Sequence, residues 1–368
     1  MSSSVAGAPA VVRRPSQVTA SWLTEVLGSR GLLGRADRVR DVAVEPVGTG
    51  QMADTVRLAA TYDPAGAGPA TLVGKFASED PRSRATGRAL RAYEAEVRFY
   101  GDVAGRVTAR VPGAIFCAFD PDDAWFTLLV EDVGDAAPGD QIAGCDADTA
   151  AAALEAMAGL HAPCWEAADL EGLEWLDRST ARSDQVTAQL VAGVLPGFIE
   201  RYGDRLSGEH LALIEAFVSN LGGWLASRPG PRTLVHGDYR LDNLLFPREP
   251  DSPVVVDFQT VIWGPAAYDL AYFVGGCLTQ AVRRAHEADL VAEYHRRLSA
   301  GGVDDYPLGQ LEADYRRESL GGVMMAVGAS MMVQQTERGD EMFVTSAARH
   351  AQHALDLDAM ALVTRGVR

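Results

Sequence analysis

The hydrophobic pattern of the chain changes its period near residue 132. Between residues 39 and 130, short runs of alternating or continuous apolar residues are separated by glycine-rich or acidic turns, which predicts β-strands. From residue 146 onward, apolar residues mostly recur at helical spacing with polar residues between them. This order predicts an α+β protein in which a small β-rich lobe is followed by a larger, mainly helical lobe.

The first lobe contains five segments with strand character and two with helical character. The predicted strands are residues 39–47, 55–62, 71–77, 113–119 and 125–130, and the predicted helices are residues 16–27 and about 83–103. We therefore expect an antiparallel sheet of five strands with one helix inserted after the third. The predicted organisation is a loose tail over residues 1–15, an N-terminal lobe over 16–132 and a C-terminal lobe over 133–368.

Charge and apolar content limit the possible partners. The 50 Asp and Glu residues exceed the 33 Lys and Arg residues, which gives a formal net charge of −17. Such a surface repels nucleic-acid phosphates and anionic lipid, so we expect neither partner. No apolar run reaches the length of about 18 residues that spans a membrane, and no secretory pattern begins the chain, which predicts a cytoplasmic protein. The four cysteines form no C-x-x-C pair and are expected to be reduced.

Lys75 is the single lysine of the chain, because the other 32 basic residues are arginine. Arginine replaces lysine readily on a surface, but not where a compact point charge has to fit. The retention of one lysine therefore marks position 75 as a candidate functional site.

A dense polar cluster begins at His236 and runs through Gly237, Asp238 and on to Asn243, in the sequence HGDYRLDN. Fourteen residues beyond Asn243, Asp257 ends the apolar run VVV and is followed by Phe-Gln. Phosphoryl transfer requires a carboxylate that orients the attacking hydroxyl, and an amide and a carboxylate that hold Mg²⁺. The order Asp, Asn, Asp at this spacing supplies those groups. A merely structural polar loop with Asx turns would not require these three residue types in this order.

The HGDxxxxN stretch and the downstream DFQ resemble the aminoglycoside phosphotransferase family, within the protein-kinase-like superfamily that includes choline kinases and ecdysteroid-kinase-like proteins. The resemblance covers most of the chain and implies a bilobal protein-kinase-like fold. It also implies transfer of the γ-phosphoryl group of ATP, with Mg²⁺, to a hydroxyl of a small molecule. The oligomeric state is not predicted.

The resemblance implies a role for each matching residue. Asp238 would orient or deprotonate the acceptor hydroxyl, and Asn243 and Asp257 would bind Mg²⁺. Lys75 would contact the α- and β-phosphates of ATP. The remaining nucleotide-binding candidates are Gly48 and Gly50 in the glycine turn, Glu96 as the partner of Lys75, and the backbone of Glu131 and Val133 next to adenine.

Several alternatives remain open from the sequence. Helical periodicity places Leu90, Tyr93, Val97 and Tyr100 on a buried stripe but does not choose between Glu94 and Glu96, and the resemblance favours Glu96. His161, His236 and Asp269 are expected to brace the catalytic loop, and Arg240 and Asp242 are expected on the surface.

Other functions must also be considered. A nucleotide-binding protein without catalysis is the main alternative, and a redox enzyme using the glycine turn for NAD is a weaker one. His350 and His353 have the spacing of a metal-binding pair, although an ordinary helical role is the simpler interpretation. The acceptor could be an aminoglycoside, a choline-like or sugar alcohol, or an apolar alcohol. Acidic residues of the helical lobe, such as Glu200, Asp204, Glu209 and Glu215, could build a pocket for a polycationic acceptor, or could form solvated helix faces.

Overall fold

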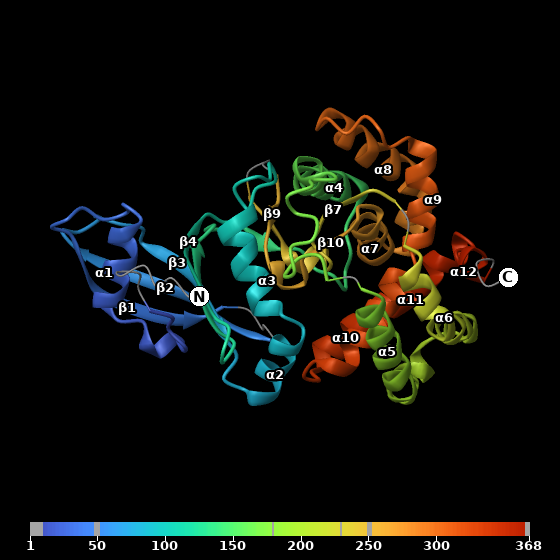
Figure 1. The fold of residues 1–368 in the computed structure, drawn as a ribbon, viewed down its shortest axis with the longest axis horizontal. Coiled ribbons are helices and arrows are strands. Elements are labelled where there is room, and N and C mark those ends of the chain that lie inside the picture. Colours follow the sequence, from blue (N-terminus) through green and yellow to red (C-terminus); the bar gives the residue numbers. More distant parts are fainter. Residues whose placement is uncertain (1–9, 48–51, 179, 229, 249–251, 365–368) are drawn as a thin grey trace. The chain divides into compact units, whose positions relative to one another are not determined.

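The computed structural model describes residues 10–47, 52–178, 180–228, 230–248 and 252–364 (Figure 1). The chain divides into two compact units. The first consists of Met1–Gly105 with Pro112–Gly134, and the second of Arg106–Val111 with Asp135–Arg368. Each unit is described by itself below.

The first unit is built on a five-stranded antiparallel sheet, drawn in blue to green in Figure 1. Its strands are β1 (Arg38–Pro46), β2 (Ala53–Asp63), β3 (Thr71–Ala77), β4 (Ala114–Asp120) and β5 (Trp125–Glu131). Their order in the sheet is β1-β2-β3-β5-β4, so β3 lies in the middle. The predicted sheet of five strands, with helical structure after the third, is therefore confirmed.

One face of this sheet is covered by helix α1 (Ala20–Ser29), which follows the short 3₁₀ turn η1 (Pro15–Gln17). The Thr19 side chain caps α1 by accepting a hydrogen bond from the Trp22 N–H. Leu23 and Leu27 are fully buried and belong to the same core cluster as Phe76 of β3. The strand and the helix are thus held together by the apolar face that the periodicity predicted.

The predicted helix over residues 83–103 is interrupted. The structure has α2 (Pro81–Ala89), α3 (Ala92–Arg98) and a π-helical turn η2 (Phe99–Val103). The break is at Arg91, which has a left-handed backbone (φ 53°).

The side chain of Tyr93 fixes the start of α3. Its hydroxyl donates to the Met52 carbonyl at 2.5 Å and its ring stacks on Phe126 at 4.7 Å. A Cβ at Gly87 would lie only 2.5 Å from the Tyr93 ring, so a larger residue could not occupy that position of α2. Leu90 lies at the break and is 42% exposed, so its predicted place on the buried stripe is wrong.

The second unit is mainly helical and runs from green to red in Figure 1. Its helices are α4 (Ala147–His161), α5 (Ala181–Tyr202), α6 (Gly208–Ala226), α7 (Ala267–Cys277), α8 (Gln280–Ala300), α9 (Leu308–Glu318), α10 (Gly321–Met332), α11 (Glu337–Asp356) and α12 (Met360–Thr364). This unit also has two small sheets. One pairs β7 (Arg232–Val235) with β10 (Ile262–Pro265). The other has the strand order β6-β8-β9 and consists of β6 (Ala137–Pro138), β8 (Leu244–Phe246) and β9 (Val254–Val255). Short 3₁₀ turns follow α4 and α5 (η3, Ala162–Cys164; η4, Gly203–Arg205) and flank β8 and β9 (η5, Leu241–Asn243; η6, Phe258–Thr260).

Helix α7 lies in the interior of the second unit, since every one of its residues is buried. Helices α5, α6, α10 and α11 share a hydrophobic core that includes Phe198, Phe217 and Trp224. Within the described residues, no helix is both long enough and apolar enough to cross a bilayer. All four cysteines are free thiols.

His350 and His353 of α11 are fully buried structural residues rather than a metal-binding pair. The His350 ring stacks on Tyr272 at 5.1 Å, and His353 Nε2 lies 2.8 Å from Glu287. A Cβ at Gly322 of α10 would lie 2.0 Å from His350 Nδ1, so this glycine makes room for the ring. Among the described residues, no three His, Cys, Asp or Glu side chains gather as a metal site.

Burial of His350 predicts loss of stability in acid. Burial lowers the pKa of His350 from 6.5 to about 3. Between these values the unfolded chain binds a proton at this position and the folded chain does not, so the unfolding free energy falls as the pH decreases. The expected contribution is up to about 1.4 kcal/mol per pH unit.

Denaturant titrations between pH 6.5 and 5 measure how steeply the unfolding free energy changes with pH. The variant His350→Gln is the reference, because the contributions of carboxylates that titrate equally in both proteins cancel in the comparison. The wild type should show the steeper loss of stability. Equal slopes in the two proteins would contradict the assignment.

Candidate active site

The predicted catalytic loop begins where β7 ends. Gly237 has φ 82°, and a Cβ there would lie 2.5 Å from the Thr260 carbonyl oxygen. The Thr260 hydroxyl in turn donates to the His236 carbonyl at 2.9 Å. Glycine is therefore required at position 237 both by the backbone angle and by the close approach of the 258–260 turn.

Replacing Gly237 by Ala should destabilise the loop through both effects, and we expect the unfolding free energy to fall by about 2 kcal/mol or more. Gly172→Ala is the matched control, because Gly172 has a similar φ of 76° but no atom within 4 Å of the added Cβ. Thermal unfolding of the two variants separates the clash from the backbone strain. A loss at Gly237 no larger than that at Gly172 would show that the close approach to Thr260 is relieved without cost.

A buried carboxylate of α7 holds the same loop. Asp269 accepts hydrogen bonds from the backbone N–H groups of His236 (2.6 Å) and Gly237 (2.9 Å), and its Oδ2 lies 3.2 Å from His161 Nε2. His236 Nε2 lies 3.0 Å from the Val256 carbonyl oxygen, next to Asp257. These contacts match the bracing role expected for His161, His236 and Asp269.

The β8–β9 ladder brings Asn243 and Asp257 to the same end of a small sheet. Leu244 pairs with Val255, and the Val256 N–H donates to the Asn243 carbonyl at 3.1 Å. Asp257 follows Val256 directly and has a left-handed backbone (φ 69°). Sequence spacing alone could not specify this antiparallel register.

The carboxylate of Asp238 contacts three side chains of the second unit. Tyr272 Oη donates to Oδ1 at 2.8 Å, while Arg240 Nε and Asn243 Nδ2 both donate to Oδ2 at 3.0 Å. Asn243 Nδ2 also lies 2.8 Å from the Asp238 carbonyl oxygen. Tyr272 was not singled out from the sequence, since it belongs to a helix that is buried on all sides and shows no periodic signal.

Arg240 and Asp242 are not simple surface residues, which corrects that expectation. The Arg240 side chain is 20% exposed, and Nη1 donates to Asp242 Oδ2 at 2.6 Å. Burial lowers the pKa of Arg240, but the charges of Asp238 and Asp242 raise it by more. Burial likewise raises the pKa of Asp242, and the guanidinium groups of Arg240 and Arg338 lower it overall. Both groups are therefore charged at neutral pH.

The donor set of Asn243 and Asp257 fits a hard cation such as Mg²⁺. The Asn243 amide nitrogen is used on Asp238, which leaves its oxygen for a metal, and Asp257 supplies a carboxylate. Protein sites for Mg²⁺ commonly contain one or two such ligands and are completed by substrate phosphates and water. A two-residue set is thus consistent with a metal that arrives with a nucleotide.

In the first unit, the structure places Lys75 of β3 beside Glu96 of α3, with Nζ 2.5 Å from Oε1. The Lys75 side chain is 14% exposed and that of Glu96 is 1% exposed. Glu94, the alternative partner, bonds instead to Arg91 at 2.8 Å. Of the two candidates, Glu96 is therefore the partner of Lys75.

The other nucleotide-binding candidates are only partly described. Glu131 is the last residue of β5, and its Oε2 accepts a hydrogen bond from the Gly113 N–H at 3.1 Å. Val133 follows two residues later and is half-buried. Gly48 and Gly50 lie outside the described residues.

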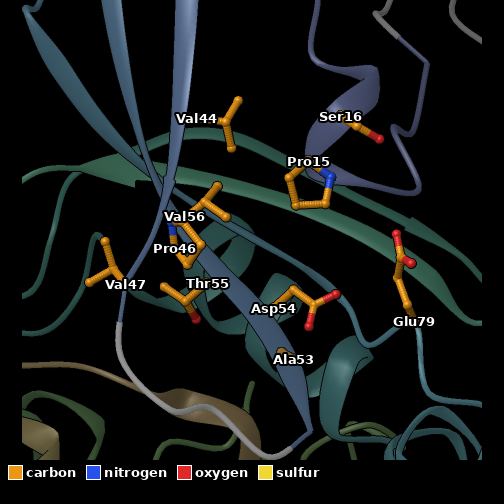
Figure 2. A pocket seen from close by; sticks show the side chains of 10 residues that line it. All are labelled: Pro15, Ser16, Val44, Pro46, Val47, Ala53, Asp54, Thr55, Val56 and Glu79. Atoms are coloured by element: carbon orange, nitrogen blue, oxygen red, sulfur yellow. The ribbon is translucent and has the colours of Figure 1, made fainter.

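A pocket of about 450 Å³ lies in the first unit where η1 approaches the adjoining ends of β1 and β2 (Figure 2). Figure 2 shows Asp54 and Glu79 on one side and Val44, Pro46 and Val56 on the other. Val56 pairs with Gly74, whereas Thr55 pairs with Lys75, so Val56 projects from the face of the sheet opposite to Lys75. The lining includes none of the predicted nucleotide-binding residues.

Comparison with known proteins identifies one family. Residues 50–301 match the model of the ecdysteroid kinase-like family, which is one of the relatives named by the sequence resemblance. This match covers more than half of the chain. No curated protein matches the chain in sequence.

Solved structures share the fold. A choline kinase from Cryptosporidium parvum is 10% identical, with a TM-score of 0.54 over 88% of this chain and 91% of that chain. An ethanolamine kinase from Plasmodium vivax is 11% identical, with a TM-score of 0.54 over 90% and 86% of the two chains. A Ralstonia eutropha protein provisionally described as an aminoglycoside phosphotransferase is 18% identical, with a TM-score of 0.52 over 90% and 98%. The predicted kinase-like fold is confirmed.

Proposed function

Since this chain belongs to the ecdysteroid kinase-like family, we propose that it transfers the γ-phosphoryl group of ATP to a hydroxyl of a small molecule, with Mg²⁺. The observation that supports this best is the cluster of Asp238, Asn243 and Asp257. Asn243 bonds Asp238 through its side chain and the strand leading to Asp257 through its backbone. These are the three groups that the reaction requires.

Each residue has a distinct part in the proposed reaction. Asp238 orients the acceptor hydroxyl toward the γ-phosphorus, and Asn243 and Asp257 hold Mg²⁺, which neutralises phosphate charge when it is bound. Lys75, held by Glu96, contacts the α- and β-phosphates. The backbone of Glu131 and Val133, with Gly48 and Gly50 of the glycine turn, completes the nucleotide site. Phosphoryl transfer depends on alignment and charge neutralisation, so this set needs no covalent intermediate.

The proposed acceptor is a small alcohol. Glu200, Asp204, Glu209 and Glu215, the acids considered for a polycationic acceptor, are all exposed on the second unit. Arg240 and Arg338 lie beside the acids of the catalytic loop and reduce its negative charge. The test below therefore compares aminoglycosides with less charged alcohols.

The test is a screen for ADP release from MgATP in the presence of aminoglycosides, choline-type alcohols, sugars and sterol-like alcohols. At least one class should accelerate ADP release above the rate in water. Calorimetry with MgATP accompanies the screen. Tight binding without turnover with any acceptor would support the alternative, a non-catalytic nucleotide-binding protein, and binding of NAD in place of ATP would support a redox role.

A further inference from the structure

The two oxygens of the Asp238 carboxylate have different surroundings. Among the described residues, Oδ2 accepts two hydrogen bonds, from Arg240 Nε and Asn243 Nδ2, whereas Oδ1 accepts one, from the Tyr272 hydroxyl. A carboxylate oxygen has two lone pairs in the plane of the group. Oδ2 is therefore fully used, and Oδ1 has one remaining lone pair. The side chain is 21% exposed, so part of it is in contact with solvent.

We infer that the acceptor hydroxyl binds Asp238 at Oδ1, and that Tyr272 and Arg240 are the positioning residues that determine this choice. The inference rests on the proposed function. In the reaction, the acceptor oxygen forms a bond to the γ-phosphorus as the bond from phosphorus to the departing ADP oxygen breaks. The hydroxyl proton passes to Oδ1 and then to solvent, which restores the carboxylate.

Tyr272 has a fixed orientation. Its ring lies between two others, stacked on Tyr268 (centroids 6.1 Å apart, planes at 4°) and on His350 (5.1 Å, 17°). Burial raises the pKa of Tyr272 well above its ordinary value, so the hydroxyl stays protonated and remains a donor. Rotation of the Asp238 carboxylate would break this bond and those on Oδ2 together.

Arg240 occupies the other carboxylate oxygen, Oδ2, with a hydrogen bond. Its guanidinium spans two carboxylates, with Nε on Asp238 and Nη1 on Asp242. Asp242 is also held by the Gln141 N–H at 3.1 Å and by Arg338. A lysine at position 240 has a single charged nitrogen and cannot reproduce this fork. Arg240 thus keeps Oδ2 occupied and turns Oδ1 toward the acceptor.

Tyr272→Phe tests the inference, with Tyr268→Phe as the matched control. Both variants keep the stacked rings, but only the first removes a hydroxyl that contacts Asp238. The assay measures ADP release from MgATP with water as the acceptor, and again with the compound that accelerates it most in the screen. We expect Tyr272→Phe to lower kcat about 10- to 100-fold, as for loss of a hydrogen bond to a charged group, with an unchanged KM for MgATP. Tyr268→Phe should stay within about twofold of wild type.

A second variant keeps the inference testable if Tyr272→Phe fails to fold. Arg240→Lys should also lower kcat without changing the KM for MgATP, whereas Arg284→Lys, which touches Asp356 and no described residue of the catalytic loop, should be close to wild type. A purely structural role would lower thermal stability and MgATP binding together with kcat.

The outcomes separate the inference from the function on which it rests. Wild-type kcat in Tyr272→Phe and in Arg240→Lys, with the acceptor reaction intact, would overturn the inference alone. Wild-type protein that binds MgATP but releases no ADP with any acceptor, water included, would overturn the proposed function and the inference with it.

Discussion

Replacing Asp238 by Asn is expected to reduce phosphoryl transfer by about 10²- to 10⁴-fold while leaving the affinity for MgATP nearly unchanged. The amide has the same shape but cannot take the hydroxyl proton. It also no longer attracts the developing positive charge on the acceptor oxygen. In the proposed reaction Asp238 orients the acceptor and does not hold nucleotide, so the affinity for MgATP should not depend on its charge. Its described partners are Tyr272, Arg240, Asn243 and the loop itself.

Two measurements define this experiment. Stopped assays of ADP and phosphorylated product give kcat, and calorimetry gives the dissociation constant for MgATP. Asp204→Asn is the control, since it makes the same chemical change at an exposed position of the second unit. Turnover of Asp238→Asn near the wild-type rate would remove Asp238 from the reaction and leave the loop with a structural role.

The fold could be predicted largely from hydrophobic periodicity. Each of the five strands of the first unit was located to within two residues, because strands that cover a core on one face alternate in a way that the sequence displays. The interruption at Arg91 was missed. Just after the break, Tyr93 bonds to Met52, a residue 41 positions earlier, and no local pattern contains that contact.

The candidate site shows the same difference between residues marked by a local sequence pattern and residues placed by tertiary contacts. Asp238, Asn243 and Asp257 could be proposed from the sequence because they form a fixed pattern along the chain. Tyr272 lies 34 residues from Asp238 on a helix whose residues are all buried, so no amphipathic signal marks it. Arg240 was expected at the surface because hydropathy assigns every arginine to water. It is half-buried and held by two carboxylates, and ion pairs of this kind are set by tertiary structure.

Lys75→Arg is expected to lose about 100-fold in activity although the formal charge is unchanged. Lys75 is mostly buried between its strand neighbours and Glu96, with Nζ 2.5 Å from the carboxylate. A guanidinium is wider than an ammonium and prefers a planar, two-point contact, so it cannot bond Glu96 and reach phosphate oxygens in the same way. The loss of one preorganised donor to phosphate is of this order.

The single lysine also permits a direct test of its contact with nucleotide. An amine-reactive ester can modify Lys75 and the terminal α-amine, and peptide mapping by mass spectrometry distinguishes them. An ammonium held in an ion pair is a poor nucleophile, so Lys75 should react slowly, and MgATP should protect it further while NAD does not. Arg35→Lys supplies an internal reference, because Arg35 is exposed and precedes β1.

The reference lysine decides how the labelling is interpreted. Protection of Lys75 with unchanged modification of the lysine at position 35 indicates that nucleotide covers the amine of β3, since a general loss of reagent would affect both. Equal modification of Lys75 with and without saturating MgATP would mean that the nucleotide does not contact this lysine. In that case Lys75 and Glu96 would form a structural ion pair, and the phosphates would have to be bound by other residues of the chain.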